Sequence, residues 1–322
     1  MYFPVADIEV SPLIPPLVAF SISFFTSPAG VTGAFLLMPF QVSILGFASP
    51  AVSPTNLVYN IVAIPSGIYR FIKEGRMAWP LAWITLIGTL PGVFLGAFIR
   101  VKYMPDASTF KVFMGLVLLF LGGQLLYNVI NRDKESQKKL KAIDERFRVH
   151  VEAERIKRQA AVSAGLAPEA VIKTIRFSLT RYEFEFWRER FSFNPLVLFS
   201  VALVVGVVGG AYGIGGGAIL APFCAVFFGL PLYAVAGAAL LGTFATSIFG
   251  VLYYTVFMPM FTASGAGVSP DWMLGIMFGA GGLLGIYCGS RFQKFIPEKV
   301  IRVALGVIIT LLALRYIGSF VI

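Results

Sequence analysis

The sequence predicts an all-α polytopic membrane protein of two inverted repeats, each with about five transmembrane or half-membrane helices, joined by a cytoplasmic linker. Of its 322 residues, 57% are hydrophobic and 13% are charged, whereas soluble globular domains average about 45–50% and about 25%. Most of the charged residues lie between residues 131 and 191. Glycine and proline also recur in the same order in the two apolar parts. Composition, charge distribution and repetition together predict this fold class.

Apolar segments of helical length occupy both halves. No charged residue lies between 10 and 69 or between 192 and 270, and a transmembrane helix needs about 20 mostly apolar residues. Glycine and proline shorten several early segments, so the region 13–47 fits either full spans or a re-entrant hairpin. We expect helices at 13–28, 31–47, 53–69, 78–100 and 109–130, and again at 195–212, 216–229, 233–256, 272–290 and 301–320.

The two halves repeat each other in register. Five glycines and prolines of the first half recur at an offset of 183: Gly30, Gly33, Pro39, Gly46 and Gly67 return as Gly213, Gly216, Pro222, Gly229 and Gly250. A glycine stripe recurs at an offset of 193, with Gly88, Gly92 and Gly96 returning as Gly281, Gly285 and Gly289. Small residues on one helix stripe let helices pack closely. The predicted units are an N-terminal repeat (1–130), a linker (131–191) and a C-terminal repeat (192–322).

Lysine and arginine positions predict the topology. Cytoplasmic loops carry an excess of basic residues, which places the linker in the cytoplasm, both termini outside and the protein in the inner (plasma) membrane. The loops 70–76 and 291–302 then lie inside, while Arg100 and Lys102 fall outside against the trend. The formal net charge of +10 is assigned to the membrane face, and no nucleic-acid partner is expected.

The linker has a composition of its own. Residues 134–158 are rich in Lys, Glu, Arg and Ala and predict a solvated or membrane-surface helix. Residues 172–193 alternate polar and aromatic side chains, which favours a short strand or hairpin. An ordered connector is one interpretation of this region, and a regulatory or partner-binding domain is the other.

The paired glycine breaks are the predicted substrate site. Inverted repeats with broken helices are typical of secondary transporters, whose substrates bind near the midplane where the half-helices end. Backbone N–H groups at a helix start favour an anion. The predicted residues are Gly30, Thr32 and Gly33 in the first break and Gly213, Gly215 and Gly216 in the second. Close packing at a kink is the alternative.

Polar residues in the apolar segments are further candidates for the site. Asn56 and Asn60 share a helix face, and Thr243, Thr246 and Ser247 cluster in the second half, where Thr243 is the repeat equivalent of Asn60. Neutral amides and hydroxyls can hydrogen-bond an oxyanion. Hydrogen bonding between helices is the alternative role. For two further residues, Ser53 and Thr55, helix capping is an equal alternative.

The charged residues favour an anionic substrate. No Asp, Glu or His lies inside an expected span, although proton-coupled carriers usually have such groups. No metal site, cofactor or nucleophile–base pair is expected, which argues against an enzyme. Basic residues near the two mouths could attract or gate an anion, or anchor the membrane edge: Arg70, Arg76 and Arg291 inside, Arg100 and Lys102 outside. A cytoplasm-negative potential favours anion export, and the alternative is uptake of an anion or a sulfur nutrient, with or without Na⁺ coupling.

The breaks resemble those of the sulfite exporter TauE/SafE family. The resemblance covers about 13–130 and 193–320 and rests on the repeated Gly-x-x-Gly…Pro pattern, which is clearest at 213–222. It implies a membrane transporter that exports sulfite, sulfoacetate or other organosulfonates. The expected partners are therefore a small anion and the lipid bilayer, and the oligomeric state is left open. Thr32 stands where the second copy has Gly215, so the two breaks need not contribute equally.

Overall fold

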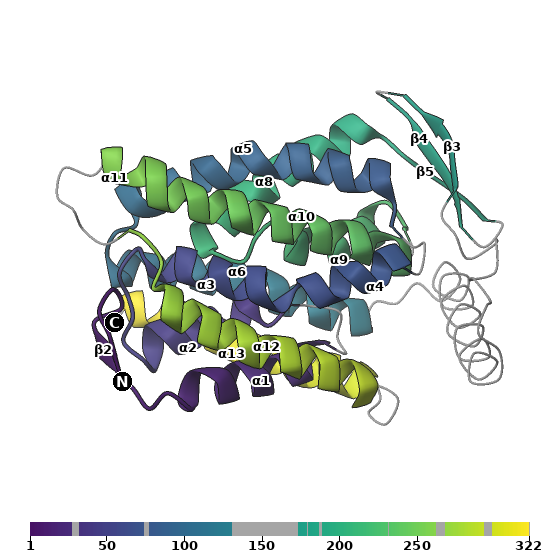
Figure 1. Cartoon of the computed structure of the whole chain (residues 1–322). Helices are drawn as coiled ribbons and strands as arrows, with labels where there is room; N and C mark the ends of the chain where they lie inside the picture. The colour runs from purple at the N-terminus through teal and green to yellow at the C-terminus, as the bar shows by residue number, and fades with distance from the viewer. Residues whose placement is uncertain are drawn as a thin grey trace.

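Long helices running side by side make up most of the computed structural model, and a small sheet lies at one end (Figure 1). The structure describes residues 1–27, 32–73, 77–130, 173–178, 180–186, 189–230, 232–261, 268–292 and 298–321. The helix predicted at 134–158 lies outside these residues.

Each predicted apolar segment contains a helix. The first half has α1 (Ile14–Thr26), α2 (Ala34–Ser43), α3 (Val52–Ala63), α4 (Pro65–Lys73), α5 (Trp79–Tyr103) and α6 (Ala107–Ile130). The second has α8 (Pro195–Tyr212), α9 (Gly217–Phe227), α10 (Leu232–Leu252), the π-helical turn η3 (Tyr253–Phe257), α11 (Met258–Phe261), α12 (Trp272–Phe292) and α13 (Glu298–Val321). Five described stretches are long and apolar enough to cross a membrane: Trp79–Tyr103, Ala107–Tyr127, Pro195–Tyr212, Val235–Met260 and Trp272–Gly289. The prediction of an all-α polytopic membrane protein is therefore confirmed.

The helices that follow the two glycine breaks, α2 and α9, are too short to span a bilayer. α2 has 10 residues and α9 has 11, which at 1.5 Å per residue is about 15 Å, half of a hydrocarbon core. α1 begins and α2 ends at the end of the bundle that holds both termini, whereas α8 begins and α9 ends beside the sheet (Figure 1). The helix pair α1–α2 and the helix pair α8–α9 thus enter the bundle from opposite ends, as inverted repeats require. The inversion itself stays a prediction.

Glycine stripes join the two halves closely. α5 packs along α8, and its repeat equivalent α12 packs along α1. A Cβ added at Gly92 or Gly96 would overlap the backbone of α8, and one added at Gly285 or Gly289 would overlap the backbone of α1. The predicted packing role of the stripes is confirmed, and each half therefore packs against the first helix of the other.

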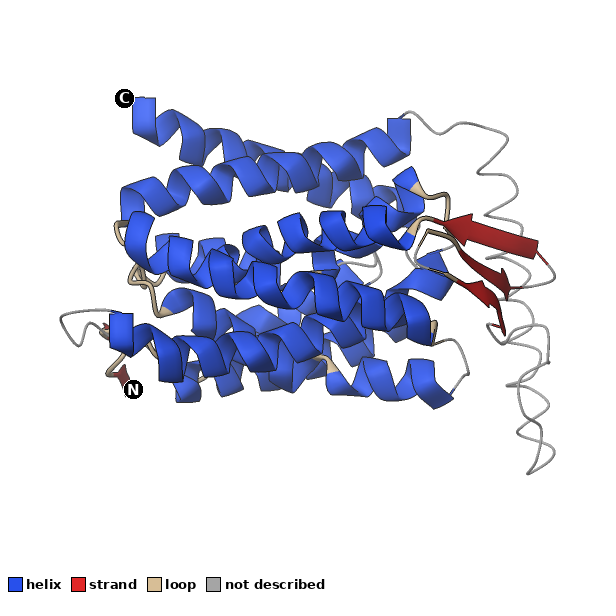
Figure 2. Ribbon diagram, turned by 90° about the horizontal axis from the view of Figure 1, so that it is seen from above, coloured by secondary structure: helices blue, strands red, loops and turns tan. Residues whose placement is uncertain are grey.

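The linker ends in a three-stranded antiparallel sheet. Its strands are β3 (Lys173–Phe177), β4 (Tyr182–Phe186) and β5 (Glu189–Phe193), in that order (Figure 2). A short strand or a hairpin was predicted here, and the structure has three strands. Tyr182 and Phe184 are fully buried, and burial raises the pKa of Tyr182. The ring of Phe193 lies 5.7 Å from that of Phe228, which ties the sheet to the end of α9.

A small hairpin covers the opposite end of the bundle. β1 (Tyr2–Phe3) pairs with β2 (Ile8–Glu9), an element that the sequence did not predict. Phe3 is fully buried, and the Ala6 N–H donates to Oδ2 of the buried Asp271. Asp271 precedes α12, where its Oδ1 accepts the Leu274 N–H. This carboxylate is therefore a helix cap at one end of the bundle.

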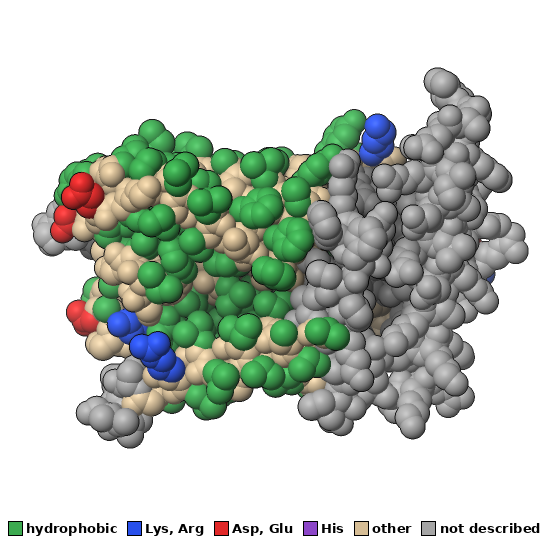
Figure 3. All heavy atoms as spheres, turned by 90° about the horizontal axis from the view of Figure 1, so that it is seen from below, with side chains coloured by type: hydrophobic (Ala, Val, Ile, Leu, Met, Phe, Trp, Pro, Cys, Tyr) green, Lys and Arg blue, Asp and Glu red, His purple; other side chains and the backbone are tan. Residues whose placement is uncertain are grey.

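The outer surface of the bundle is apolar. Figure 3 shows hydrophobic side chains across the middle of one face, with acidic side chains at one end and basic side chains at both ends. On α5, Trp83, Ile87 and Leu95 are each more than half exposed and lie on one stripe. Such a surface fits contact with lipid.

Candidate functional site

The second glycine break is a sharp turn between α8 and α9. Gly213 and Gly215 have φ of 82° and 70°, a region that side-chain-bearing residues rarely adopt. The N–H groups of Gly213 and Ile214 both donate to the Gly209 carbonyl, and this pair of hydrogen bonds closes the last turn of α8. A Cβ added at Gly213 would overlap the backbone of Ser53 on α3. Glycine is therefore required here both for the turn and for contact with α3.

Polar side chains from other helices satisfy the carbonyl groups of this break. The last carbonyls of a helix have no partner within the helix, and here four hydrogen bonds supply donors. They run from Tyr254 to Gly210 (3.1 Å), from Ser53 to Ala211 (2.9 Å), from Asn56 to Gly213 (3.0 Å) and from Asn60 to Ile214 (3.0 Å). The polar face of α3 thus acts as a cap for the end of α8.

The two asparagines differ in what they leave free. The Asn56 amide also donates to the Ala34 carbonyl (2.9 Å), and its Oδ1 accepts from Gln41 (3.1 Å). Both of its N–H donors are therefore used in this conformation. Asn60 has one donated bond, and its buried Oδ1 has no hydrogen-bond partner among the described residues. Of the two, only Asn60 has an amide N–H not used in a hydrogen bond among the described residues.

Hydroxyl groups of α10 lie beside the amide end of the break. A Cβ added at Gly215 would lie 2.8 Å from Cγ2 of Thr243 and 3.3 Å from Oγ of Ser247, and one added at Gly217 would overlap Oγ1 of Thr243. The hydroxyls of Thr243, Thr246 and Ser247 each donate to a carbonyl one turn back, at 2.9, 2.6 and 2.7 Å. The structure therefore brings Thr243 and Ser247 to the second break, whereas none of the atoms nearest to a Cβ at Gly215, Gly216 or Gly217 belongs to Thr246.

Thr89 on α5 is a neighbour of the break that sequence reasoning missed. A Cβ added at Gly216 would lie 2.6 Å from Cγ2 of Thr89. Thr89 is buried and donates to the carbonyl of Thr85, one turn earlier on the same face. Two threonines four residues apart in an apolar helix were the available signal. α9 begins here with Gly216 as its N-cap and has no side-chain cap, so its first N–H groups lie next to Thr89 and Thr243.

The first break is only partly described. Gly30 lies outside the described residues. A Cβ added at Gly33 would lie 2.9 Å from the Tyr59 hydroxyl, which is hydrogen-bonded to Ser23 (2.8 Å). The Thr32 Oγ1 is buried and has no hydrogen-bond partner among the described residues. The start of α2 is thus covered by a tyrosine side chain.

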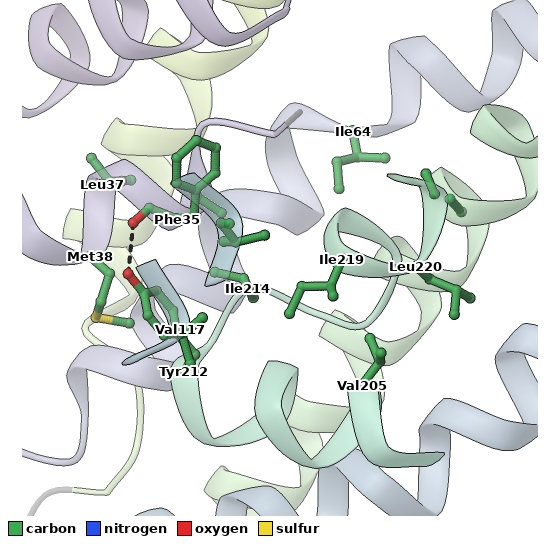
Figure 4. Close-up of a cluster of buried hydrophobic side chains, with 14 of the residues drawn as sticks. Phe35, Leu37, Met38, Ile64, Val117, Val205, Tyr212, Ile214, Ile219 and Leu220 are labelled. Carbon is green, nitrogen blue, oxygen red and sulfur yellow. Dashed lines mark hydrogen bonds between the residues drawn. The ribbon is translucent and has the colours of Figure 1, made fainter. Parts of the chain in front are cut away.

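Tyr212 links the second break to α2. Pro39 has no N–H, so it cannot bond the Phe35 carbonyl as a helix interior normally would. The Tyr212 hydroxyl donates to that carbonyl instead (2.8 Å, Figure 4). Together with Asn56, which bonds both Ala34 and Gly213, this contact connects the two predicted half-sites.

Ser53 and Thr55 do not cap α3, whose N-cap is Ala51. Ser53 donates to Ala211 across the interface between the halves. The Thr55 hydroxyl donates to the Ala51 carbonyl and accepts the N–H of Asp271 (2.9 Å). Neither residue therefore caps its own helix α3, and Ser53 helps instead to cap the end of α8.

Arg100 does not lie at an open mouth. Its side chain is fully buried, its guanidinium carbon lies 3.8 Å from the centre of the Phe110 ring, and it donates to the carbonyls of Met104 and Ala48. These contacts join α5 to the loop before α3, so Arg100 is a structural group here, neither an exposed anchor nor an accessible attractor. Lys102 is exposed over the rings of Phe98 and Tyr103. Arg76 and the side chains of Arg70 and Arg291 lie outside what the structure describes.

Comparison with known proteins identifies one family. The profile described as "Sulfite exporter TauE/SafE" matches residues 16–316, nearly the whole chain. No curated protein and no solved structure matches it. Among the described residues no group of three His, Cys, Asp or Glu side chains lies close enough to hold a metal ion.

Proposed function

Because the chain belongs to the sulfite exporter TauE/SafE family, a family of membrane transporters and not enzymes, we propose that it exports small sulfur-containing anions such as sulfite, sulfoacetate or related organosulfonates. We place the chain in the inner membrane, with the sheet in the cytoplasm and both termini outside. Transport occurs by alternating access between two inverted repeats. The proposed partners are the anion and the lipid bilayer.

The observation that carries this proposal is the uncapped start of α9. Gly216 caps the helix without a side chain, and the free N–H groups of a helix start carry a partial positive charge. Two buried hydroxyls, those of Thr89 and Thr243, lie against the same residues. Amides and hydroxyls can bind the oxygens of a sulfonate or sulfite without holding it as tightly as a fixed cation would. A transporter must also release its substrate.

The contacts around the break explain how the site can switch. The hydroxyl bonds of Thr89 and Thr243 to their own helices are of a kind that barely stabilises a helix, so each hydroxyl can turn toward an anion. The α8–α9 hairpin is tied to the first half through Asn56 and Tyr212. Movement of one hairpin against the other half therefore changes the surroundings of the amide end, as alternating access demands.

Direction follows from the membrane potential. Moving one negative charge outward releases about 2.3 kcal/mol per 100 mV when the cytoplasm is negative. Export thus needs no coupling carboxylate. In the described part of the chain the one buried carboxylate is Asp271, whose oxygens are already bonded to backbone N–H groups at the end of the bundle.

A second candidate function is Na⁺-linked uptake. The buried Oδ1 of Asn60 and Oε1 of Gln41 have no partner among the described residues, and carbonyl oxygens are suitable Na⁺ ligands. Accumulation of sulfite in proteoliposomes driven by an inward Na⁺ gradient would favour this candidate. An efflux rate that does not change with the Na⁺ gradient would exclude Na⁺-linked uptake.

Sulfite efflux from proteoliposomes tests the proposal. We expect the wild-type protein to release loaded sulfite faster when the inside is negative, and Thr243→Val, which removes only the hydroxyl, to slow release. Thr310→Val is the matched control, because Thr310 makes the same one-turn bond to Gly306 on α13 and contacts α6. Wild-type liposomes that release no sulfite or sulfoacetate would refute the export function. Equal rates for the two variants would remove Thr243 from the site.

A further inference from the structure

The two repeats are filled differently at the starts of their short helices. At the offset of 183, Tyr59 on α3 corresponds to Gly242 on α10, and at the offset of 193, Thr89 on α5 corresponds to Gly282 on α12. The packing follows the same correspondence, because α3 packs against α12 as α10 packs against α5. The two neighbourhoods can therefore be compared residue by residue.

In the first half a phenol ring occupies the space at the helix start. A Cβ added at Gly282 would lie 3.0 Å from Cζ and 3.1 Å from the hydroxyl of Tyr59, and one added at Gly33 would lie 2.9 Å from that hydroxyl. Tyr59 and Ser23, its hydrogen-bond partner, are both buried. The ring and hydroxyl of Tyr59 thus fill the place where an anion would meet the N-terminus of α2.

In the second half neither of these side chains has an equivalent. Tyr59 is replaced by Gly242 and Ser23 by Gly206. The atom closest to a Cβ added at Gly242 is Oγ1 of Thr85, at 3.5 Å, an ordinary contact distance. Thr89 and Thr243, both smaller side chains than tyrosine, stand near the start of α9. The second half therefore lacks the phenol ring and the serine that cover the start of α2 in the first half.

The side-chain oxygen of Asn60 is a buried acceptor without a partner among the described residues, and Asn60 is bonded to the second break. Asn60 bonds Ile214, two residues before Gly216, and its fully buried Oδ1 has no hydrogen-bond partner among the described residues. A buried acceptor without a partner costs free energy. A ligand at the start of α9 would supply the missing donor, either from its own proton or from a water molecule bound with it.

We propose that the transporter has one substrate position, at the start of α9 in the second half, and that Tyr59 permanently closes the equivalent position in the first half. The ligand is one small oxyanion, held by the N–H groups of Gly216 and Gly217 and the hydroxyls of Thr89 and Thr243. Gly242 provides the room, and its side chain would limit the size of the substrate. This assignment rests on the proposed transport of sulfur oxyanions and adds which half binds and how many ions.

Transplanting the first-half residues into the second half tests the assignment. Gly242→Tyr combined with Thr89→Gly reproduces the pair Tyr59 and Gly282. We expect purified wild-type protein to bind one sulfite per chain by calorimetry and to release sulfite from proteoliposomes, and the double variant to do neither. Tyr59→Phe, which keeps the ring and removes the hydroxyl, is the control and should bind one sulfite per chain.

If the double variant does not fold, a series of variants with side chains of increasing size at Gly242 tests the assignment instead. Gly242→Ala and Gly242→Val have room for their Cβ, so sulfite affinity should fall as the side chain grows while the melting temperature stays near that of the wild type. Tyr59→Phe, which keeps the ring, should leave affinity unchanged. Wild-type binding of two sulfites, or unchanged affinity across the Gly242 series, would overturn the assignment but leave export standing. A wild-type protein that neither binds nor moves sulfite would overturn both.

Discussion

The break between α8 and α9 has two sides of opposite chemistry. On the carbonyl side, residues 210–214 receive hydrogen bonds from side chains on α3 and η3. On the amide side, α9 starts at Gly217 with no side-chain cap, and within the described part of the chain the hydroxyls of Thr89 and Thr243 beside it bond to their own helices. A site that was expected to bind an anion through all its polar groups is thus divided into a satisfied, structural side and an unsatisfied side. Changes on the first side should affect stability, and changes on the second should affect transport.

Gly213→Ala should have the largest effect on stability. A Cβ at φ of 82° costs about 1–2 kcal/mol, and its overlap with the Ser53 backbone adds about 1–3 kcal/mol for overpacking. We expect a loss of about 2–5 kcal/mol, measured as thermal unfolding in detergent. Gly123→Ala is the control, because nothing lies within 4 Å of a Cβ at that helical position. Equal melting temperatures for the two variants would show that the turn is not required.

Asn56→Leu should come second. It removes two donated hydrogen bonds, to Ala34 and Gly213, and the acceptor of Gln41. At about 1 kcal/mol for each group left without a partner, the loss is about 3 kcal/mol. Asn60→Leu removes one donated bond and should cost about 1 kcal/mol. A larger loss of stability in Asn60→Leu than in Asn56→Leu would contradict the assignment of more structural hydrogen bonds to Asn56.

Tyr212→Phe should have the smallest effect, about 1 kcal/mol for one hydrogen bond between helices. The loss depends on Pro39, because that proline leaves the Phe35 carbonyl without its helical donor. Pro39→Ala restores an N–H at this position, so Tyr212→Phe should cost less in that background. Unfolding of the two single variants and the double variant measures the coupling. If the stability losses of Tyr212→Phe and Pro39→Ala simply added in the double variant, the two residues would not act on the same Phe35 carbonyl.

The sequence predicted the features that depend on local composition. Helix positions followed from apolar runs, and the packing glycines followed from a repeated stripe, because both signals lie within one segment. The partners of Asn56 and Ser53 could not be predicted in this way. Their bonds to the end of α8 and the turn after it span 158 residues from Ser53 and 157 from Asn56, and only the packing of the two halves brings these groups together.

Arg100 and Thr89 show the same limit. Near the end of a helix, an arginine fits a membrane-edge anchor by sequence alone, and burial against Phe110 with carbonyl partners is visible only in three dimensions. Thr89 has an ordinary sequence context, and its significance comes from contact with Gly216. The sequence therefore identified the second break but did not distinguish its structural side from its binding side.

Locating a bound anion tests the central claim most directly. Selenite is a heavier analogue of sulfite, and anomalous scattering from its selenium would mark its position in crystals of the protein. We expect one peak per chain, with selenite oxygens about 3 Å from the N–H groups at the start of α9 and beside Thr89 and Thr243. A peak at the start of α2, beside Arg100, or on the carbonyl side of the break would contradict the account.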